Sequence, residues 1–280
     1  MKKIIVALDG LKYSRGSSSY AIYLAKQMSA HLVGIFLDDF TYHSYKVYDL
    51  IHDDEPVSEE EVERCEEDDA QRRKESVEEF KSACREEGIE YSVHHDRNIA
   101  IRELLHESIY ADLMVIDSKE TLTHYEENRP TRFISNLLPH IECPVIVAPS
   151  SSTPIRKLVL LYDGDPSSVY AIKMFSCLFS TMEDLETEVI TVKTNDHHSR
   201  TPDNRLMREF MRRHYPNAQY TILKGYPDIE VTNYLKHKHQ GEIVILGAYR
   251  RGLVSRWFRP SMADTLMQEL TCPLFIAHNK

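Results

Sequence analysis

The chain has 280 residues, 42% hydrophobic and 28% charged, a composition typical of a globular protein with room for two domains. No apolar run reaches the length of a membrane span, and five cysteines without a C-x-x-C pair argue against a disulfide framework, so we expect a cytoplasmic protein. Residues 1–153 carry 17 Lys and Arg against 30 Asp and Glu, whereas residues 154–280 carry 17 against 14. We therefore expect the two halves to have different ligands or partners.

The first half begins with an apolar, β-rich run, Lys3 to Leu8, which ends in Asp9-Gly10 and leads into a helical stretch. The pattern then predicts strands at 32–37, 90–94, 113–116 and 145–148, and helices at 18–28, 99–108 and 132–138. An insert, residues 40–69, separates the second strand from the third. Its first part is rich in Tyr and His, and its second part is acidic and merges into a long helix that ends near residue 87.

The second half repeats this order of elements, which indicates an internal duplication. It opens with Lys157 to Tyr162 followed by Asp163-Gly164, and both first helices contain Tyr-Ala-Ile, at Tyr20 to Ile22 and at Tyr170 to Ile172. The remaining strands are predicted at 188–193, 218–223, 243–246 and 274–277, and the remaining helices at 204–214, 228–238 and 262–270.

Strands that alternate with helices require crossover connections, so each half is expected to be an α/β domain with a five-stranded parallel sheet covered on both faces. The predicted architecture is two tandem Rossmann-like domains, residues 1–149 and 155–280, joined by a Pro/Ser/Thr linker at 150–154. Ligands of such open sheets lie beyond the carboxyl ends of the strands. We therefore expect the site at the loops that follow strands one and four.

The loop after the fourth strand runs from Gly247 to Ser261 in the second half and from Asp117 to Thr131 in the first. Each loop follows an apolar run, precedes a helical pattern and closes on proline followed by a hydroxyl residue. In the second half the loop is basic, and a basic loop between a strand end and a helix start is suited to a phosphate.

With these features the chain resembles the universal stress protein family, in its tandem two-domain form, over essentially its full length. The residues that carry the resemblance are Asp9 and Asp163 at the strand ends, the Cys-Pro pairs at Cys143 and Cys272, the order of five strands and the two loops. The resemblance implies an adenine nucleotide alpha hydrolase-like fold, two domains related by a pseudo-twofold axis, and pairing of their fifth strands within one chain. It also implies an ATP site, with a Gly-x2-Gly-x9-Gly-Ser/Thr loop for the phosphates and an aspartate for the adenine.

Matched to this motif, the first half has Asp117, Glu120, Pro130 and Thr131, and the second half has Gly247, Arg250, Pro260 and Ser261. Carboxylates repel a triphosphate and proline has no amide hydrogen to donate, so we expect no ATP in the first half. Arginine can replace amide donors, so the candidate ligand-binding residues are Asp163, Gly247, Arg250 and Ser261, with ATP or another adenine nucleotide as the ligand. The alternative is that the arginines form a solvated loop or pair with the acidic first half.

Neither a P-loop, nor a Gly-x-Ser-x-Gly turn, nor metal-ligand spacing occurs, so we expect no catalytic residue and no metal. Three functions stay open. The first is a non-enzymatic stress-response binding or signalling module that binds a nucleotide or another phosphorylated ligand in its second domain only. The second is a protein-interaction module in which both nucleotide sites are vestigial. The third is a weak ATPase.

The acidic segment 53–69 is the candidate docking surface for a protein partner, and its alternative interpretation is a solvated helix face with i,i+4 ion pairs such as Glu60 with Arg64. Nucleic acid and membranes are not expected as partners. The expected assembly is a pseudo-dimer within one chain, and homodimerisation stays open.

Overall fold

The structure is a computed structural model, and it describes residues 2–37, 59–96, 99–123, 125–150, 153–193, 201–236, 241–248 and 261–278. The chain divides into two compact units, Met1–Glu142 and Cys143–Lys280. No helix in these described ranges is long and apolar enough to cross a membrane.

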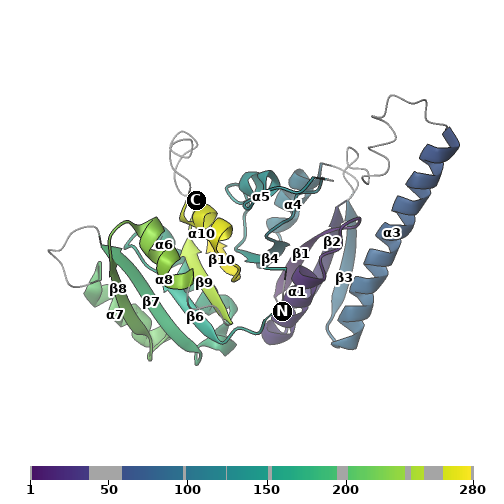
Figure 1. The fold of residues 1–280 in the computed structure, drawn as a ribbon. Coiled ribbons are helices and arrows are strands. Elements are labelled where there is room, and N and C mark those ends of the chain that lie inside the picture. Colours follow the sequence, from purple (N-terminus) through teal and green to yellow (C-terminus); the bar gives the residue numbers. More distant parts are fainter. Residues whose placement is uncertain are drawn as a thin grey trace. The chain divides into compact units, whose positions relative to one another are not determined.

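The described part of the first unit contains parallel strands in the order β3-β2-β1-β4, with helices in the connections (Figure 1). Lys3 pairs with His31 on one side of β1, and Ile4 pairs with Leu113 on the other. The elements are β1 (Lys3–Asp9), α1 (Arg15–Met28), β2 (His31–Leu37), α3 (Glu59–Glu86), β3 (Tyr91–Asp96), α4 (Ala100–Ser108), β4 (Leu113–Asp117) and α5 (Arg132–Leu137).

The second unit has the strand order β5-β10-β9-β6-β7-β8 in its described part. Its elements are β5 (Val145–Ala148), β6 (Lys157–Leu161), α6 (Pro166–Leu178), the short 3-10 helix η1 (Ser180–Met182), β7 (Glu186–Lys193), α7 (Asn204–His214), β8 (Gln219–Lys224), α8 (Pro227–Lys236), β9 (Glu242–Gly247), α10 (Met262–Glu269) and β10 (Leu274–Ala277). The predicted α/β class is confirmed, and the element boundaries differ from the predicted ones by a few residues.

The fifth strands of the two halves pair as expected. Leu274 lies opposite Val147 and Phe275 opposite Ile146, in an antiparallel ladder between β10 and β5. Because β5 pairs with β10, it is grouped with the second compact unit, so the boundary between the units precedes Cys143. The sequence composition instead predicts a linker after β5, at 150–154.

The strands form because their residues are apolar and β-prone along the whole run, as is typical of parallel sheets buried on both faces. All residues of β4, β5 and β10 are buried, and only the first residue of β1, β2 and β6 is not. Helix α1 begins after Ser14, whose side chain accepts a hydrogen bond from the Ser17 amide as an N-cap. The core of each unit therefore lies along its own sheet.

Helix α3 packs on the sheet through its C-terminal half. Phe80 is fully buried, with its ring centroid 5.9 Å from that of Phe36 and 6.1 Å from that of Tyr91. Gly34 makes room for it, because a Cβ atom there would lie 2.7 Å from the Phe80 ring. Figure 1 shows the helix running beside β3 and extending beyond the end of the sheet, and residues 60–68 are mostly exposed.

Candidate ligand-binding site

Two of the four predicted site residues meet at the carboxyl ends of neighbouring strands in the second unit. Strands β6 and β9 are parallel neighbours, with Leu160 opposite Ile245. Continuing this register places Tyr162 opposite Gly247, the last residue of β9, and Asp163 one position further along, level with Ala248. The structure thus brings Asp163 and Gly247 to one edge of the sheet, as the sequence predicted.

Gly247 is required by packing. A Cβ atom at this position would lie 2.4 Å from the carbonyl carbon and oxygen of Ser167 and 2.7 Å from the amide nitrogen of Ser168, both in the first turn of α6. No side chain fits at such a separation from backbone atoms. Close approach of a helix therefore explains this glycine, without any ligand.

The packing at Gly247 follows from where α6 begins. Twelve residues separate the start of β1 at Lys3 from the start of α1 at Arg15, but only nine separate Lys157 from Pro166. Pro166 opens α6 at a position where proline is favoured, because the missing amide hydrogen is not needed there. The earlier start brings the backbone of α6 over the end of β9.

Asp163 is exposed, and its Oδ1 accepts a hydrogen bond from the Asp165 amide at 2.9 Å. This contact closes the turn between β6 and α6, in which Gly164 has a φ of +92°. Burial raises the pKa of the nearby Tyr162 phenol, and the charges of Asp203 and Asp163 raise it further. Asp163 therefore has a structural role in the turn and keeps a solvent-facing carboxylate.

Ser261 is the N-cap of α10 and belongs to a capping box. Its side chain accepts a hydrogen bond from the Asp264 amide at 3.1 Å, and its own amide donates to Asp264 Oδ2 at 2.9 Å. The fourth predicted residue, Arg250, lies outside the described residues, together with the rest of the basic loop between 249 and 260.

The corresponding edge of the first unit is occupied by the chain's own carboxylates. Asp9, Asp117 and Glu120 are 1%, 6% and 7% exposed. Asp9 is equivalent to Asp163, since each lies six residues after the lysine that opens its first strand, and Asp9 Oδ1 accepts the Leu11 amide at 2.7 Å. The same turn contact thus occurs twice, once buried among acidic side chains and once in solvent.

Glu120 folds back onto its own loop. Its Oε1 accepts hydrogen bonds from the Thr121 amide at 3.0 Å and from the Leu122 amide at 2.9 Å. Burial raises the pKa of the Glu120 carboxyl to about 8, and the charges of Asp9 and Asp117 add to this effect. The two amide hydrogen bonds act to lower this pKa, but their effect is smaller than that of burial and the two charges.

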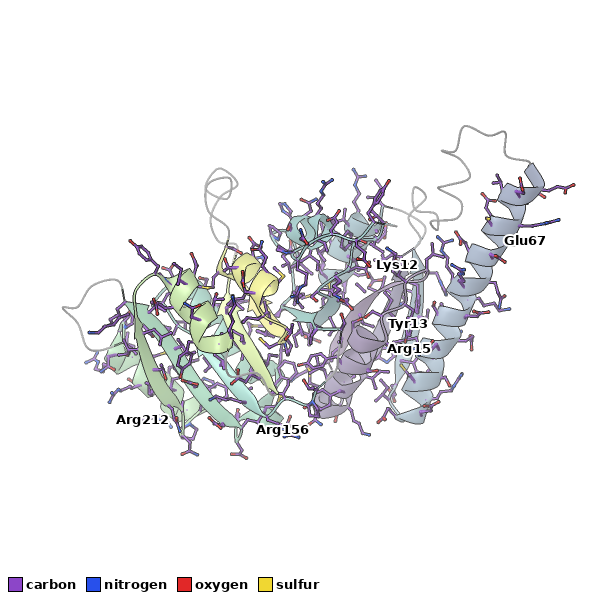
Figure 2. The ribbon with its side chains drawn as sticks, viewed as in Figure 1. Lys12, Tyr13, Arg15, Glu67, Arg156 and Arg212 are labelled. Atoms are coloured by element: carbon purple, nitrogen blue, oxygen red, sulfur yellow. The ribbon has the colours of Figure 1, made fainter. Side chains whose placement is uncertain are left out.

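Side chains also tie the two loops of this unit together. The Ser14 hydroxyl donates to Asp117 Oδ2, and Lys12 Nζ donates to the Thr123 carbonyl at 2.6 Å. The Thr131 hydroxyl donates to the Glu120 carbonyl while capping α5. Figure 2 labels Lys12 in the loop after β1. Buried carboxylates and a closed loop make this edge electrostatically unfavourable for a phosphate.

Sequence reasoning missed the contacts that close the first site. Ser14 and Lys12 lie in the turn after β1, where no motif identified them. Thr131 was recognised by its place in the loop, but its bond to the Glu120 carbonyl depends on how the loop folds. No group of three or more His, Cys, Asp or Glu residues in the described ranges is arranged to hold a metal ion.

No protein-family model and no curated protein sequence matches the chain. Solved structures do. A universal stress protein from Archaeoglobus fulgidus DSM 4304 superposes with a TM-score of 0.71 at 13% identity, covering 99% of this chain and 98% of that one. A putative universal stress protein from Pseudomonas aeruginosa UCBPP-PA14 gives a TM-score of 0.58 at 14% identity, covering 99% and 92%. The chain therefore has the fold of universal stress proteins along its whole length.

Proposed function

We propose that the chain is a non-enzymatic, cytoplasmic binding module of the universal stress protein family, and that its second unit binds an adenine nucleotide or another phosphorylated ligand. The residues proposed to hold the ligand are Asp163, Gly247, Arg250 and Ser261. The single observation that carries this proposal is the asymmetry between the two strand-end sites. Asp163 is exposed, whereas its equivalent Asp9 is buried beside Asp117 and Glu120.

Each residue has a distinct proposed role. The exposed Asp163 carboxylate accepts hydrogen bonds from the base, as in the family that the chain resembles. Arg250 donates to phosphate oxygens, since a guanidinium can form bidentate contacts that replace amide donors. The Ser261 oxygen already accepts the Asp264 amide, so its hydroxyl hydrogen is the part that can be donated to a ligand. Gly247 keeps the strand end free of a side chain.

Calorimetric titration with ATP, ADP and AMP tests the proposal. We expect binding by the unaltered chain that is weakened in Asp163→Ala and in Arg250→Ala. Lys119→Ala, an exposed position in the corresponding loop of the first unit, is the matched control and should bind normally. Absence of heat at millimolar nucleotide would refute the proposal. Phosphate release from ATP that disappears in Asp163→Ala would instead support a weak ATPase.

A second function is favoured by a different observation. Gly247 and Ser261 both have structural roles that need no ligand, which is what two vestigial sites would show. In that case the chain is a protein-interaction module, and the acidic segment 53–69 is its docking surface. Residues 53–58 lie outside the described part, but residues 60–68 of α3 are mostly exposed. Neutralising Glu60, Glu63 and Glu67 to Gln should then change which proteins co-purify, and the unaltered chain should give no heat on nucleotide titration.

A further inference from the structure

Helix α7 in the second unit presents a basic face to solvent. Its buried side is formed by Met207 and Met211, and Arg205, Arg208 and Arg212 are exposed on the other side. None of these three arginines forms an ion pair with a carboxylate in the described part of the chain. Their charges are therefore available to an acidic partner.

The basic face continues onto the edge strand β8 through Tyr220. The Arg208 guanidinium lies over the Tyr220 ring, with Cζ 5.9 Å from the ring centroid. Partial burial raises the pKa of the Tyr220 phenol, and the charges of Arg208 and Arg212 oppose the increase, so both arginines lie near it. Arginine and tyrosine are among the residues that contribute most often to binding at interfaces.

We define the α7 face as Arg205, Arg208, Arg212 and Tyr220. Its three arginines occur at i, i+3 and i+7, so they follow one side of the helix over about 10 Å. An acidic helix with the same spacing can match them one to one.

The chain carries such a helix in α3. Between Glu59 and Asp69 there are eight acidic residues and one basic residue. Glu60, Glu63 and Glu67, which we define as the α3 face, are exposed and occur at i, i+3 and i+7. The ion pair expected between Glu60 and Arg64 does not form in the structure, and no described residue pairs with any glutamate of this face. Figure 2 labels Glu67 on α3 and Arg212 at the surface of the second unit.

We propose that the α7 face of one molecule binds the α3 face of a second copy of this chain. The proposal rests on the interaction function given above and does not depend on ligand binding. A second copy is favoured because each molecule supplies both complementary faces. Nucleic acid is disfavoured because the whole chain carries a net charge of −10. A dimer with a twofold axis would contain the contact twice.

The contact joins exposed charges, so it should be weak and sensitive to salt. Sedimentation velocity of the full chain over a range of concentrations measures it. We expect association at low salt that is lost at about 0.5 M salt, where charges more than ~5 Å apart are screened. Arg212→Glu and Glu67→Arg should each weaken association by more than about tenfold.

Matched controls are present on the same helices. Arg213 and Glu66 are exposed but point about 90° away from the two faces. Arg213→Glu and Glu66→Arg should therefore associate like the unaltered chain, although they change the net charge by the same amount. Mixing the Arg212→Glu chain with the Glu67→Arg chain should restore association, because the two reversed charges then face each other.

The proposal is overturned if the unaltered chain stays monomeric at every concentration, or if the mixture of reversed chains fails to associate. Loss of association in Arg212→Glu but not in Glu67→Arg would also overturn it, since the occupant of the α7 face would then be another anionic partner such as nucleic acid. The nucleotide titration of the Arg212→Glu chain should match that of the unaltered chain. Failure of the unaltered chain to bind nucleotide therefore does not affect the association test. Failure to associate likewise does not affect the nucleotide proposal.

Discussion

Glu120 is a carboxyl group placed where its charge is poorly tolerated. It is 7% exposed, lies near two other buried carboxylates, and is stabilised by only two backbone amides through Oε1. The pKa of about 8 means that the folded chain binds a proton here that the unfolded chain releases near pH 4.5. Because the folded-state pKa is raised, the contribution of Glu120 to stability is greatest below pH 4.5 and is lost as the pH rises toward 8.

Glu120→Gln should remove this pH dependence, since glutamine keeps a carbonyl oxygen for the two amides and carries no charge. We expect the variant to exceed the unaltered chain in free energy of unfolding by about 2 kcal/mol at pH 8.5 and to equal it near pH 4.5. Urea unfolding at the two values measures the difference. Glu126→Gln, at an exposed position in the same loop, is the control and should change neither value. Equal stability of both chains at pH 8.5 would contradict the prediction.

Gly247 gives a second test at the scale of one residue. Gly247→Ala places a Cβ atom 2.4 Å from the backbone of Ser167, so strand β9 or helix α6 must shift. We expect a loss of about 1–3 kcal/mol in the free energy of unfolding, measured without any ligand. Asp163→Asn, which keeps the turn contact to the Asp165 amide, should lose little stability. If Gly247→Ala lost nucleotide affinity but no stability, the glycine would serve the ligand and not the packing.

At the scale of the elements, each unit contains a polar network in which a first-strand lysine and a third-strand residue contact one carboxylate. The residues that form this network differ between the two units. Lys3 and Lys157 open their first strands and pair with His31 and Glu186. His94 of β3 lies opposite Ile35, four residues after His31, and Thr221 of β8 lies opposite Ile190, four residues after Glu186. His94 and Thr221 are therefore equivalent positions in the two units. In both units the lysine and the third-strand residue contact one carboxylate.

The carboxylate comes from a helix in one unit and from a strand in the other. Glu107 of α4 contacts Lys3 Nζ at 3.0 Å and His94 Nδ1 at 2.6 Å. Glu188 of β7 contacts Lys157 Nζ at 3.0 Å and accepts from the Thr221 hydroxyl at 2.5 Å. The duplication has therefore retained a position for negative charge, while the residue that supplies it has changed.

The network around Glu188 should stabilise the second unit. Burial acts to raise the pKa of the Glu188 carboxyl, but hydrogen bonds from Thr221 and Tyr234 and the contact with Lys157 outweigh it and lower that pKa to about 2. Since the folded-state pKa is lowered, the stabilisation is present above pH 4.5 and is lost as the pH falls toward 2.

Lys157→Met should leave the Glu188 side chain, 6% exposed, without its cation, and lower the free energy of unfolding at pH 7 by about 3 kcal/mol. The matched control is Lys236→Met, which breaks the pair with Glu269 where the side chains are 41% and 43% exposed. That loss should stay below about 1 kcal/mol. Equal losses in the two variants, measured by urea unfolding, would show that burial adds nothing to the first pair.

The elements were predictable because their signals are local. Apolar runs such as 113–116 identify strands buried on both faces, and the repeat supplies each assignment twice. The role of Gly247 was not predictable, because it depends on α6 starting three residues earlier than α1 relative to its strand. The closure of the first loop by Glu120 depends in the same way on one side chain turning back, which residue spacing does not reveal.

At the scale of the whole molecule, the boundary between the units has a physical consequence. Strand β5 is grouped with the second unit because its apolar residues pair with β10. Without β5, strand β10 would become an open edge of buried, apolar residues from Leu274 to Ile276. An exposed flat edge of this composition favours aggregation.

Two fragments test which boundary matters for folding. The fragment 143–280 keeps the ladder between β5 and β10, whereas the fragment 155–280, which begins after the predicted linker, lacks it. We expect 143–280 to unfold cooperatively in urea, and 155–280 to aggregate or to unfold at a lower denaturant concentration. If 155–280 were as stable as 143–280, pairing with β5 would contribute nothing to the second unit, and its folding boundary would lie at the linker.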